Sequence, residues 1–125
     1  MFELAQNLEI TLLLDIYGGL LTEKQRDVLS LYYDEDLSLS EIADNEGITR
    51  QGVHDSIKRA EVQLVEIEEK LGFLRIFRDI AKQADAIESV VDGIDKYNSY
   101  HGMSKELFSK TKEIRELLNL FRELN

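Results

Sequence analysis

Residues 49–60 contain the side chains with the clearest chemical potential. Arg50, Lys58 and Arg59 are opposed there only by Asp55, whereas the whole chain carries a formal net charge of −10. Basic and amide side chains on one exposed helix face can read base edges and hold the phosphates of duplex DNA. The predicted nucleic-acid-binding residues are Arg50, Gln51, His54, Lys58 and Arg59. An ordinary solvated helix face is the alternative, and the acidic Asp55 favours it.

The sequence lacks the patterns that support catalysis or a metal site. There is no cysteine, so thiolate chemistry, thiolate metal ligands and disulfides are excluded. His54 and His101 lie in separate segments with no serine motif around them, and the consecutive acids at 34–36 lack the alternate spacing of a calcium loop. No glycine-rich phosphate loop occurs. We expect a protein that is not an enzyme and needs no cofactor, with no catalytic and no metal-binding residues.

The composition favours helices over sheet. Proline is absent, glycine occurs seven times, and 43% hydrophobic with 32% charged residues is the mixture of an ordered globular protein. Apolar residues at helical spacing predict six helices, over about residues 3–17, 22–33, 38–47, 49–71, 73–97 and 104–121. In the first helix the apolar stripe recurs every four residues, at Leu4, Leu8, Leu12 and Ile16. We therefore expect an all-α fold.

Capping signals mark where several of these helices begin and end. Residues 22–25 and 38–41 have the form of capping boxes, in which a hydroxyl and a Gln or Glu side chain satisfy exposed backbone donors. Gly47 is placed to adopt the left-handed conformation that ends a short helix, and Thr49 can cap the long helix that follows. These signals predict a short helix, a tight turn and a long helix in succession.

The apolar residues around this turn follow the spacing of a helix-turn-helix. Small Ala43 lets two helices cross closely, Gly47 supplies the turn four residues later, and Val53 follows after six more. The residues expected to fill the wedge between the helices are Ile48, Val53 and Ile57, and apolar Ile42 flanks the motif. The pattern predicts a helix-turn-helix over residues 38–71 with a long recognition helix, and an ordinary helical hairpin is the alternative.

Apolar stripes continue along the recognition helix and beyond it. The stripe of the recognition helix comprises Val53, Ile57, Ala60, Leu64, Ile67 and Leu71. Those of the last two helices comprise Phe73, Phe77, Ile80, Ala84, Ile87, Val91 and Ile94, and then Leu107, Thr111, Ile114, Leu118 and Phe121. We assign residues 1–72 to a helix-turn-helix domain and 73–125 to a C-terminal helical pair that serves as a dimerisation element. A homodimer is expected, because helix-turn-helix proteins commonly bind two half-sites as symmetric pairs.

Charge is divided unevenly between these two parts. Residues 1–72 hold 6 basic and 16 acidic side chains, whereas residues 73–125 hold 9 of each. The predicted helix-turn-helix therefore lies in the part that a phosphate backbone repels. The first residues carry acid where a signal peptide needs base, and no apolar run approaches the ~20 residues of a membrane span. We expect a cytoplasmic protein without membrane contact.

Several runs of residues together resemble the YlxM family: Leu21–Gln25, Leu31–Tyr33, Leu37–Ala43, Thr49–Gln51 and Ile57–Arg59. That family consists of small bacterial proteins with a helix-turn-helix similar to region 4 of sigma factors, often encoded beside the signal recognition particle GTPase. The resemblance covers about residues 12–71. Sigma region 4 places an apolar residue three after Val53, where Ser56 stands here, which predicts a rotated or repacked recognition helix. Gly52 in its first turn costs about 0.5–1 kcal/mol relative to alanine.

The resemblance and the basic stretch lead to two hypotheses about function. In the first, a DNA-binding regulatory protein of the signal recognition particle pathway reads base edges with Arg50 and Gln51 and holds phosphates with Lys58 and Arg59. In the alternative, an accessory protein binds the signal recognition particle GTPase or RNA without sequence-specific DNA binding. The acidity of residues 1–72 favours the alternative.

Overall fold

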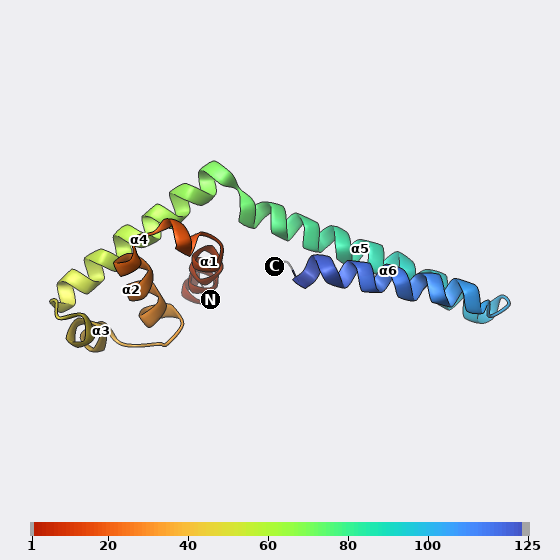
Figure 1. The fold of residues 1–125 in the computed structure, drawn as a ribbon, viewed down its shortest axis with the longest axis horizontal. Coiled ribbons are helices and arrows are strands. Elements are labelled where there is room, and N and C mark those ends of the chain that lie inside the picture. Colours follow the sequence, from red (N-terminus) through yellow and green to blue (C-terminus); the bar gives the residue numbers. More distant parts are fainter. Residues whose placement is uncertain (1, 124–125) are drawn as a thin grey trace. The chain divides into compact units, whose positions relative to one another are not determined.

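The protein is built from helices, as the composition predicts. The computed structural model describes residues 2–123, with side chains described from Leu8 onward. The helices are α1 (Phe2–Tyr17), the short 3-10 helix η1 (Gly18–Leu20), α2 (Glu23–Tyr33), α3 (Leu39–Glu46), α4 (Arg50–Leu71), α5 (Phe73–Tyr100) and α6 (Lys105–Glu123). The part of the chain that the structure describes contains no strand (Figure 1). The all-α prediction is confirmed.

The chain forms two compact units, Met1–Leu74 and Arg75–Asn125. We call the first the head and the second the hairpin. The sequence-based assignment put the boundary after residue 72, whereas Leu74 is 5% exposed and belongs to the core of the head.

The ends of α2, α3 and α4 follow the predicted capping signals. The Thr22 hydroxyl accepts the Gln25 amide at 3.2 Å, and the Gln25 side chain accepts the Thr22 amide at 3.1 Å. Ser38 and Glu41 form the same reciprocal pair at 3.1 and 3.2 Å. Gly47 follows α3 with φ 69°, in the left-handed region where a side chain would be strained. Local sequence chemistry therefore determines these boundaries.

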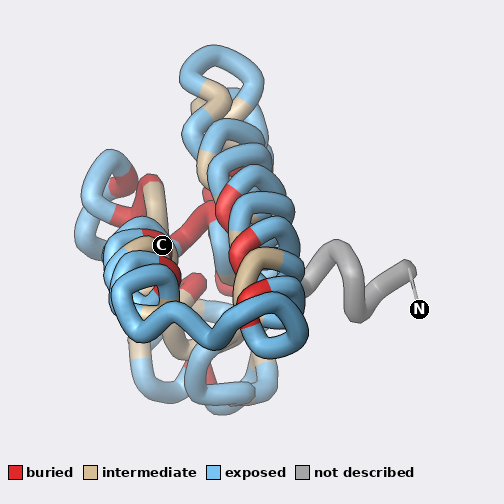
Figure 2. The backbone as a smooth tube through the Cα atoms, turned by 90° about the vertical axis from the view of Figure 1, so that its right-hand side faces the viewer, coloured by how far each residue is buried: buried red, intermediate tan, exposed pale blue. Residues whose placement is uncertain are grey.

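The core of the head lies against α4, which packs against α1, α2 and α3. The inward side of α4 presents Val53, Ile57, Ala60 and Leu64, none more than 4% exposed. Val28 and Leu29 of α2 meet this face and are fully buried. Figure 2 shows the pattern along the chain, with buried positions recurring on helices that are otherwise exposed. The stripe predicted for the recognition helix is correct as far as Leu64, whereas Ile67 is partly buried and Leu71 is 46% exposed.

The predicted apolar stripe of α1 is wrong. Leu8 and Leu12 are 61% and 40% exposed, Ile16 is only partly buried, and the Leu4 side chain lies outside the described residues. The residues of α1 that face the core are Ile10, Leu13, Leu14 and Tyr17. Leucine and isoleucine occur on several sides of α1, so helical spacing alone does not distinguish its faces. Packing against α4 selects the face that carries Tyr17.

Tyr17 and Glu68 hold the start of α5 within the head. The Tyr17 hydroxyl donates to Glu68 Oε1 at 2.6 Å and accepts the Phe73 amide at 3.1 Å. The same Glu68 oxygen accepts the Leu74 amide at 3.0 Å. Burial, together with the hydrogen bond to Glu68, raises the pKa of Tyr17. Side chains from α1 and α4 therefore satisfy two exposed donors of the first turn of α5.

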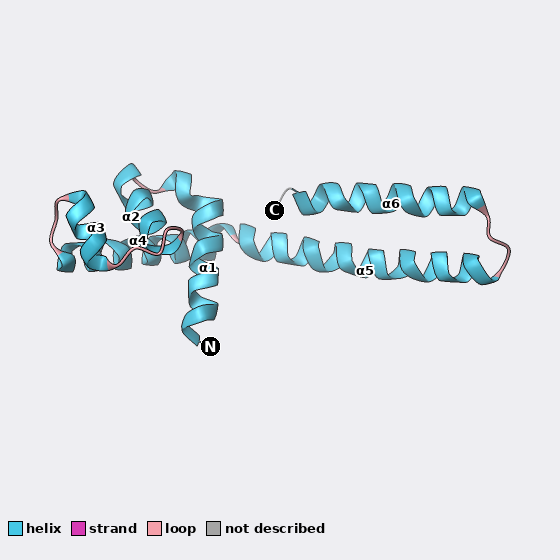
Figure 3. Cartoon of the chain, turned by 90° about the horizontal axis from the view of Figure 1, so that it is seen from below, coloured by secondary structure: helices cyan, strands magenta, loops and turns pink. Residues whose placement is uncertain are grey.

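In the hairpin, α5 and α6 run antiparallel beside each other (Figure 3). Asn98 closes the turn by donating to the Ser104 carbonyl at 2.9 Å and accepting the Ser104 amide at 2.8 Å. These bonds let α5 continue to Tyr100, three residues beyond its predicted end. Ser104 caps α6 as predicted, since its hydroxyl accepts the Leu107 amide at 3.2 Å. Few residues are deeply buried here: Ala84, Val91, Asn98, Thr111 and Leu118.

The predicted stripes of α5 and α6 are therefore only half buried. Phe73, Ile80, Ile87, Leu107 and Phe121 all remain between 37% and 52% exposed. Two helices can cover only a narrow strip of each other, which leaves the edges of a wide apolar face open.

Within residues 2–123, no helix is both long enough and apolar enough to span a bilayer.

Candidate nucleic-acid interface

The predicted helix-turn-helix is present in the head as α3, a turn at Gly47, and α4. Ile42 and Ala43 are buried against α4, and the Ile48 amide donates to the Ala43 carbonyl at 3.1 Å across the turn. The Thr49 hydroxyl accepts the Gly52 amide at 2.9 Å and so caps α4. The ordinary helical hairpin considered as the alternative does not describe this arrangement, because α4 crosses α3 and packs also on α1 and α2.

The departure from the sigma pattern has a simple packing basis. Val53 and Ile57 are 0% and 4% exposed, whereas Ser56 is only partly buried. The inward face of α4 therefore begins with a spacing of four residues, and Ser56 lies at its edge. Ser56 instead contributes to a polar groove described below.

Gly52 also has a structural role. A Cβ atom at this position would lie 3.1 Å from the Thr49 hydroxyl and 3.8 Å from Ile48 Cδ1. A side chain would thus crowd the hydroxyl that caps α4 at the point where the Gly52 amide donates to it. The low helix propensity of glycine is offset here by the close approach of the cap.

All five residues predicted to contact nucleic acid are exposed on α4: Arg50, Gln51, His54, Lys58 and Arg59. They lie in the first three turns of the helix, outside the face that carries Val53 and Ile57. The structure therefore places the predicted residues together on the solvent side of the recognition helix. Three of the five take part in polar contacts with neighbouring side chains.

Asp55 lies among these residues and engages two of them. The Gln51 side-chain amide donates to Asp55 Oδ1 at 3.0 Å, and His54 Nδ1 lies 3.6 Å from the same oxygen. The His54 and Asp55 side chains are each 49% exposed, so water screens this pair. This bond occupies one of the two N–H donors of the Gln51 amide and restricts the orientation of its side chain, which makes Asp55 a competitor for the predicted reading residue.

Lys58 forms an ion pair with Glu61, whose carboxylate is also hydrogen-bonded to α2. Its Nζ lies 3.6 Å from Glu61 Oε2, and the Glu61 side chain is only 13% exposed. The Tyr33 hydroxyl of α2 donates to the other Glu61 oxygen. Burial and the hydrogen bond to Glu61 raise the pKa of Tyr33. The fixed carboxylate orients the ammonium group of Lys58 but also offsets part of its charge.

Arg50 and Arg59 form no ion pair within the described residues. Arg59 borders a groove of about 300 Å³ between α4 and the start of α2. The groove is lined by Thr22, Lys24, Gln25, Ile48, Gly52, Ser56 and Arg59. It brings two cations and two hydroxyl groups to one place on the head.

Lys24 is a residue that the sequence-based reasoning missed. It lies 35 positions before Arg59, inside the first capping box, and no short-range pattern connects the two. Only the packing of α2 on α4 brings them to one groove. A signal was present nonetheless, because Lys24 is one of only six basic residues in positions 1–72.

Potential metal ligands are not gathered in the part of the chain that the structure describes. From Leu8 to Glu123, no group of three or more His, Cys, Asp or Glu side chains is arranged to hold a metal ion. Asp34, Glu35 and Asp36 all lie exposed in the segment between α2 and α3. Fold and exposed basic face together define a small helix-turn-helix protein.

Comparison with known sequences identifies the family. The profile of the UPF0122 family, described as "Putative helix-turn-helix protein, YlxM / p13 like", matches residues 4–107. The chain belongs to this family, so the YlxM resemblance is confirmed, and the match reaches beyond residues 12–71 through α5 into α6. The UPF0122 protein of Desulforamulus reducens is 44% identical over 110 residues, which cover 86% of this chain and 94% of the relative.

Two further relatives give the same result. The UPF0122 protein of Clostridium kluyveri is 41% identical over 107 residues, covering 86% of this chain and 92% of that protein. The UPF0122 protein of Thermoanaerobacter pseudethanolicus is 41% identical over 108 residues, with the same coverage of both chains. The similarity therefore extends over nearly the full length of each relative, and the family match includes α5 and the first residues of α6.

Proposed function

We propose that this protein is a cytoplasmic DNA-binding regulator that contacts duplex DNA through the first half of α4. The observation that carries the proposal is the helix-turn-helix geometry. Val53 and Ile57 bury one face of α4 while the predicted contact residues remain on its exposed side. A helix presented in this way has the width and polarity to enter a major groove.

The proposed contacts divide into base readers and phosphate holders. Arg50 and Gln51, in the first turn of α4, are proposed to read base edges, and His54 lies one turn further along the helix. Lys58 and Arg59 are proposed to hold phosphates. Lys24 lies with Arg59 on the polar groove, so a phosphate there would meet two cations from different helices.

The acidity of the head sets limits on such binding. Residues 1–72 hold 16 acidic and only 6 basic side chains, so most of the head repels a phosphate backbone. Binding is therefore expected to be weak at physiological salt and to depend on the local basic face. Each phosphate contact contributes about −0.9 to the slope of log affinity against log salt concentration. Lys24, Lys58 and Arg59 would give a slope near −2.7 per protomer.

Titration of the full-length protein with random duplex DNA at several salt concentrations tests the proposal. Arg50→Glu combined with Lys58→Glu is expected to abolish duplex binding while helicity and thermal stability stay nearly unchanged, because both side chains are exposed. Lys82→Glu combined with Lys112→Glu, on the exposed surface of the hairpin, changes the net charge equally and is expected to retain binding. Equal losses in both variants would attribute the binding to net charge alone.

A second candidate function is supported by the same acidity. In it, the head is an accessory surface that binds the GTPase or the RNA of the signal recognition particle, and the acidity favours the GTPase of the two. An acidic surface suits a basic protein partner better than a polyphosphate chain. Absence of duplex binding at low salt, together with tight binding to the GTPase, would select this candidate. For either function, we further propose that the chain acts as a homodimer.

A further inference from the structure

The two flanks of the hairpin differ in chemistry. On one flank, Arg115 of α6 bridges to Asp95 at 2.6 Å and to Asp92 at 2.7 Å. Two turns further along α6, Arg122 bridges to Asp85 at 2.9 Å and also to Glu88. The hydrogen bond from Thr111 and the adjacent Arg115 lower the pKa of Asp95. This flank is closed by ion pairs within the chain, and its arginines are already occupied.

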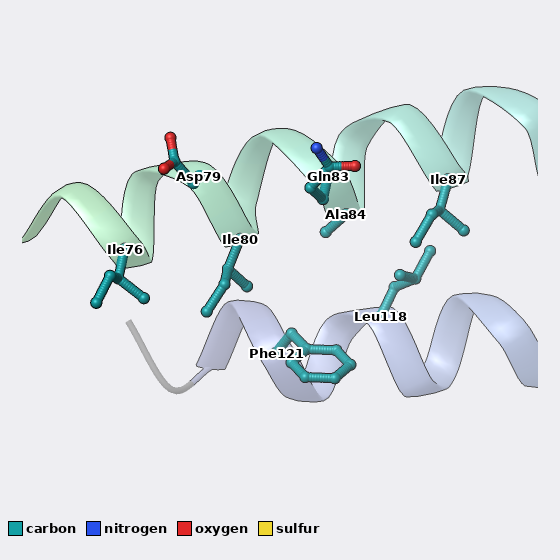
Figure 4. A pocket seen from close by; sticks show the side chains of 8 residues that line it. All are labelled: Ile76, Asp79, Ile80, Gln83, Ala84, Ile87, Leu118 and Phe121. Atoms are coloured by element: carbon teal, nitrogen blue, oxygen red, sulfur yellow. The ribbon is translucent and has the colours of Figure 1, made fainter. Parts of the chain in front are cut away.

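The opposite flank is apolar and open. A groove of about 310 Å³ lies between α5 and α6 there, lined by Ile76, Asp79, Ile80, Gln83, Ala84, Ile87, Leu118 and Phe121. Figure 4 shows the isoleucines of α5 projecting toward the side of α6 that bears Leu118 and Phe121. Helical spacing extends the same side to further exposed residues. We call the apolar flank the set Ile76, Ile80, Ile87, Val90, Tyr97, Leu107, Leu117 and Phe121, each between 37% and 66% exposed.

The exposed area of the apolar flank is that of a protein interface. If side chains of this size are about half exposed, the set supplies roughly 700 Å², close to the ~800 Å² that each partner buries in a standard interface. An isolated pair of helices cannot cover such a face, whereas four helices packed around one core can. The deeply buried apolar residues of the hairpin are only Ala84, Val91 and Leu118 among those described, so its core is incomplete.

We propose that the apolar flank is the surface on which a second copy of this chain docks, with the two hairpins antiparallel in a four-helix bundle. The surface forms the homodimer proposed above, and it does not depend on DNA binding. In such a symmetric interface, the same flank of each copy faces the other across a twofold axis.

The charges at the two ends of the apolar flank favour a second copy of the chain in the antiparallel arrangement. Asp79 lines the groove at the open end of the hairpin. Lys110, seven residues before Leu117 and so on the same side of α6, lies near the turn, because its neighbour Thr111 is hydrogen-bonded to Asp95 at 2.5 Å. Antiparallel docking brings Asp79 of each copy toward Lys110 of the other. The attraction is formed twice and competes only with the exposed pair that Lys110 forms with Glu113 at 3.7 Å, whereas parallel docking would bring the Asp79 side chains of both copies to the same end.

The distribution of charge and of apolar positions also suits self-association. Residues 73–125 hold 9 basic and 9 acidic side chains, so two hairpins do not repel each other as two heads do. The midpoint between Ile76 and Tyr97 falls at residues 86–87, near the middle of α5. A twofold axis there sets each apolar end of α5 against the opposite apolar end of the second copy.

Sedimentation of the full-length protein across ~1–100 µM tests the proposal, with a dimer expected. Ile80→Glu combined with Ile87→Glu is expected to raise the dissociation constant at least about 100-fold, because two charges would be buried at the interface. Lys82→Gln combined with Ser89→Glu has the same spacing and the same change in net charge, but lies outside the flank on exposed positions, and should leave the dimer intact. A monomer at all concentrations, or a dimer that the isoleucine substitutions do not weaken, would overturn the proposal.

Exchanging the charges at positions 79 and 110 tests whether the two hairpins dock antiparallel. This test remains informative if the variant with both isoleucine substitutions fails to fold. Asp79→Lys alone and Lys110→Asp alone are each expected to weaken the dimer by about tenfold, and the double variant to recover most of the loss. The two positions lie at opposite ends of one hairpin, so recovery requires contact between copies. Additive losses in the double variant would exclude the antiparallel arrangement.

Discussion

At the residue scale, acidic side chains of α4 compete with a ligand for the side chains proposed to contact DNA. Gln51 and His54 both approach one Asp55 oxygen, and Lys58 is shared with Glu61, so the exposed cations and amides are partly occupied before any ligand arrives. Arg50 and Arg59 are the exceptions, since neither forms an ion pair with any described residue. The charge that is available to a phosphate is therefore smaller than the count of basic residues suggests.

Removing Asp55 is expected to strengthen duplex binding. Asp55→Asn keeps the shape of the side chain, removes a negative charge from the recognition helix and weakens the hold on Gln51. We expect an affinity gain of about 5- to 10-fold at low salt that shrinks as salt rises, because the screened repulsion of one charge is worth about 1 kcal/mol. Fluorescence anisotropy with a labelled duplex measures it.

Asp44→Asn provides the control for this substitution. Asp44 is also exposed and acidic, but it lies on α3, outside the residues proposed to contact DNA. An equal gain from both substitutions would show that total charge, and not the geometry around Gln51, limits binding.

At the element scale, the sequence predicted the helix ends and turns that depend on side chains close together in the chain. The capping boxes at Thr22 and Ser38 and the turn at Gly47 depend on residues close together in the chain, and all three are present. The buried face of α1 could not be predicted, because apolar residues occur on several of its sides and packing against α4 makes the choice. The groove joining Lys24 to Arg59 and the ion pairs of the hairpin depend on tertiary packing, which helical periodicity does not contain.

The turn of the helix-turn-helix gives a test at this scale. Gly47→Ala is expected to destabilise the head by about 1 kcal/mol, because a non-glycine residue at φ 69° is strained. No atom lies within 4 Å of the added Cβ, so the effect is conformational rather than steric. Urea denaturation measures it, and Gly93→Ala, within α5 and equally open, should instead be neutral or slightly stabilising. Equal effects at both positions would contradict this account of the turn.

At the scale of the whole molecule, the two units are expected to respond to acid in opposite directions. The lowered pKa of Asp95 means that its contribution to stability is present above its unfolded value and is lost as pH falls through the folded value, below about pH 4. The hairpin therefore loses the ion pair between Asp95 and Arg115 with acid. The head carries the net negative charge, so lowering that charge relieves its self-repulsion.

Hydrogen exchange followed residue by residue between pH 7 and pH 3.5 can separate the two responses. We expect protection in α5 and α6 to decrease relative to α2 and α4 once the intrinsic pH dependence of exchange is removed. Arg115→Gln should reduce the pH dependence of the hairpin but not abolish it, because the hydrogen bond from Thr111 to Asp95 and the ion pairs of Arg122 remain. A hairpin that keeps its protection at low pH would show that its apolar contacts alone are sufficient.

The hydrogen bonds around Glu68 bear on the order of folding. The first turn of a helix is its most unfavourable step, because several residues are ordered before the hydrogen bonds accumulate. Tyr17 and Glu68 supply acceptors for the first amides of α5, and both belong to the segment that leaves a ribosome first. We therefore expect a folded head to lower the free-energy cost of starting α5, because two of the first amides of that helix find acceptors on the head.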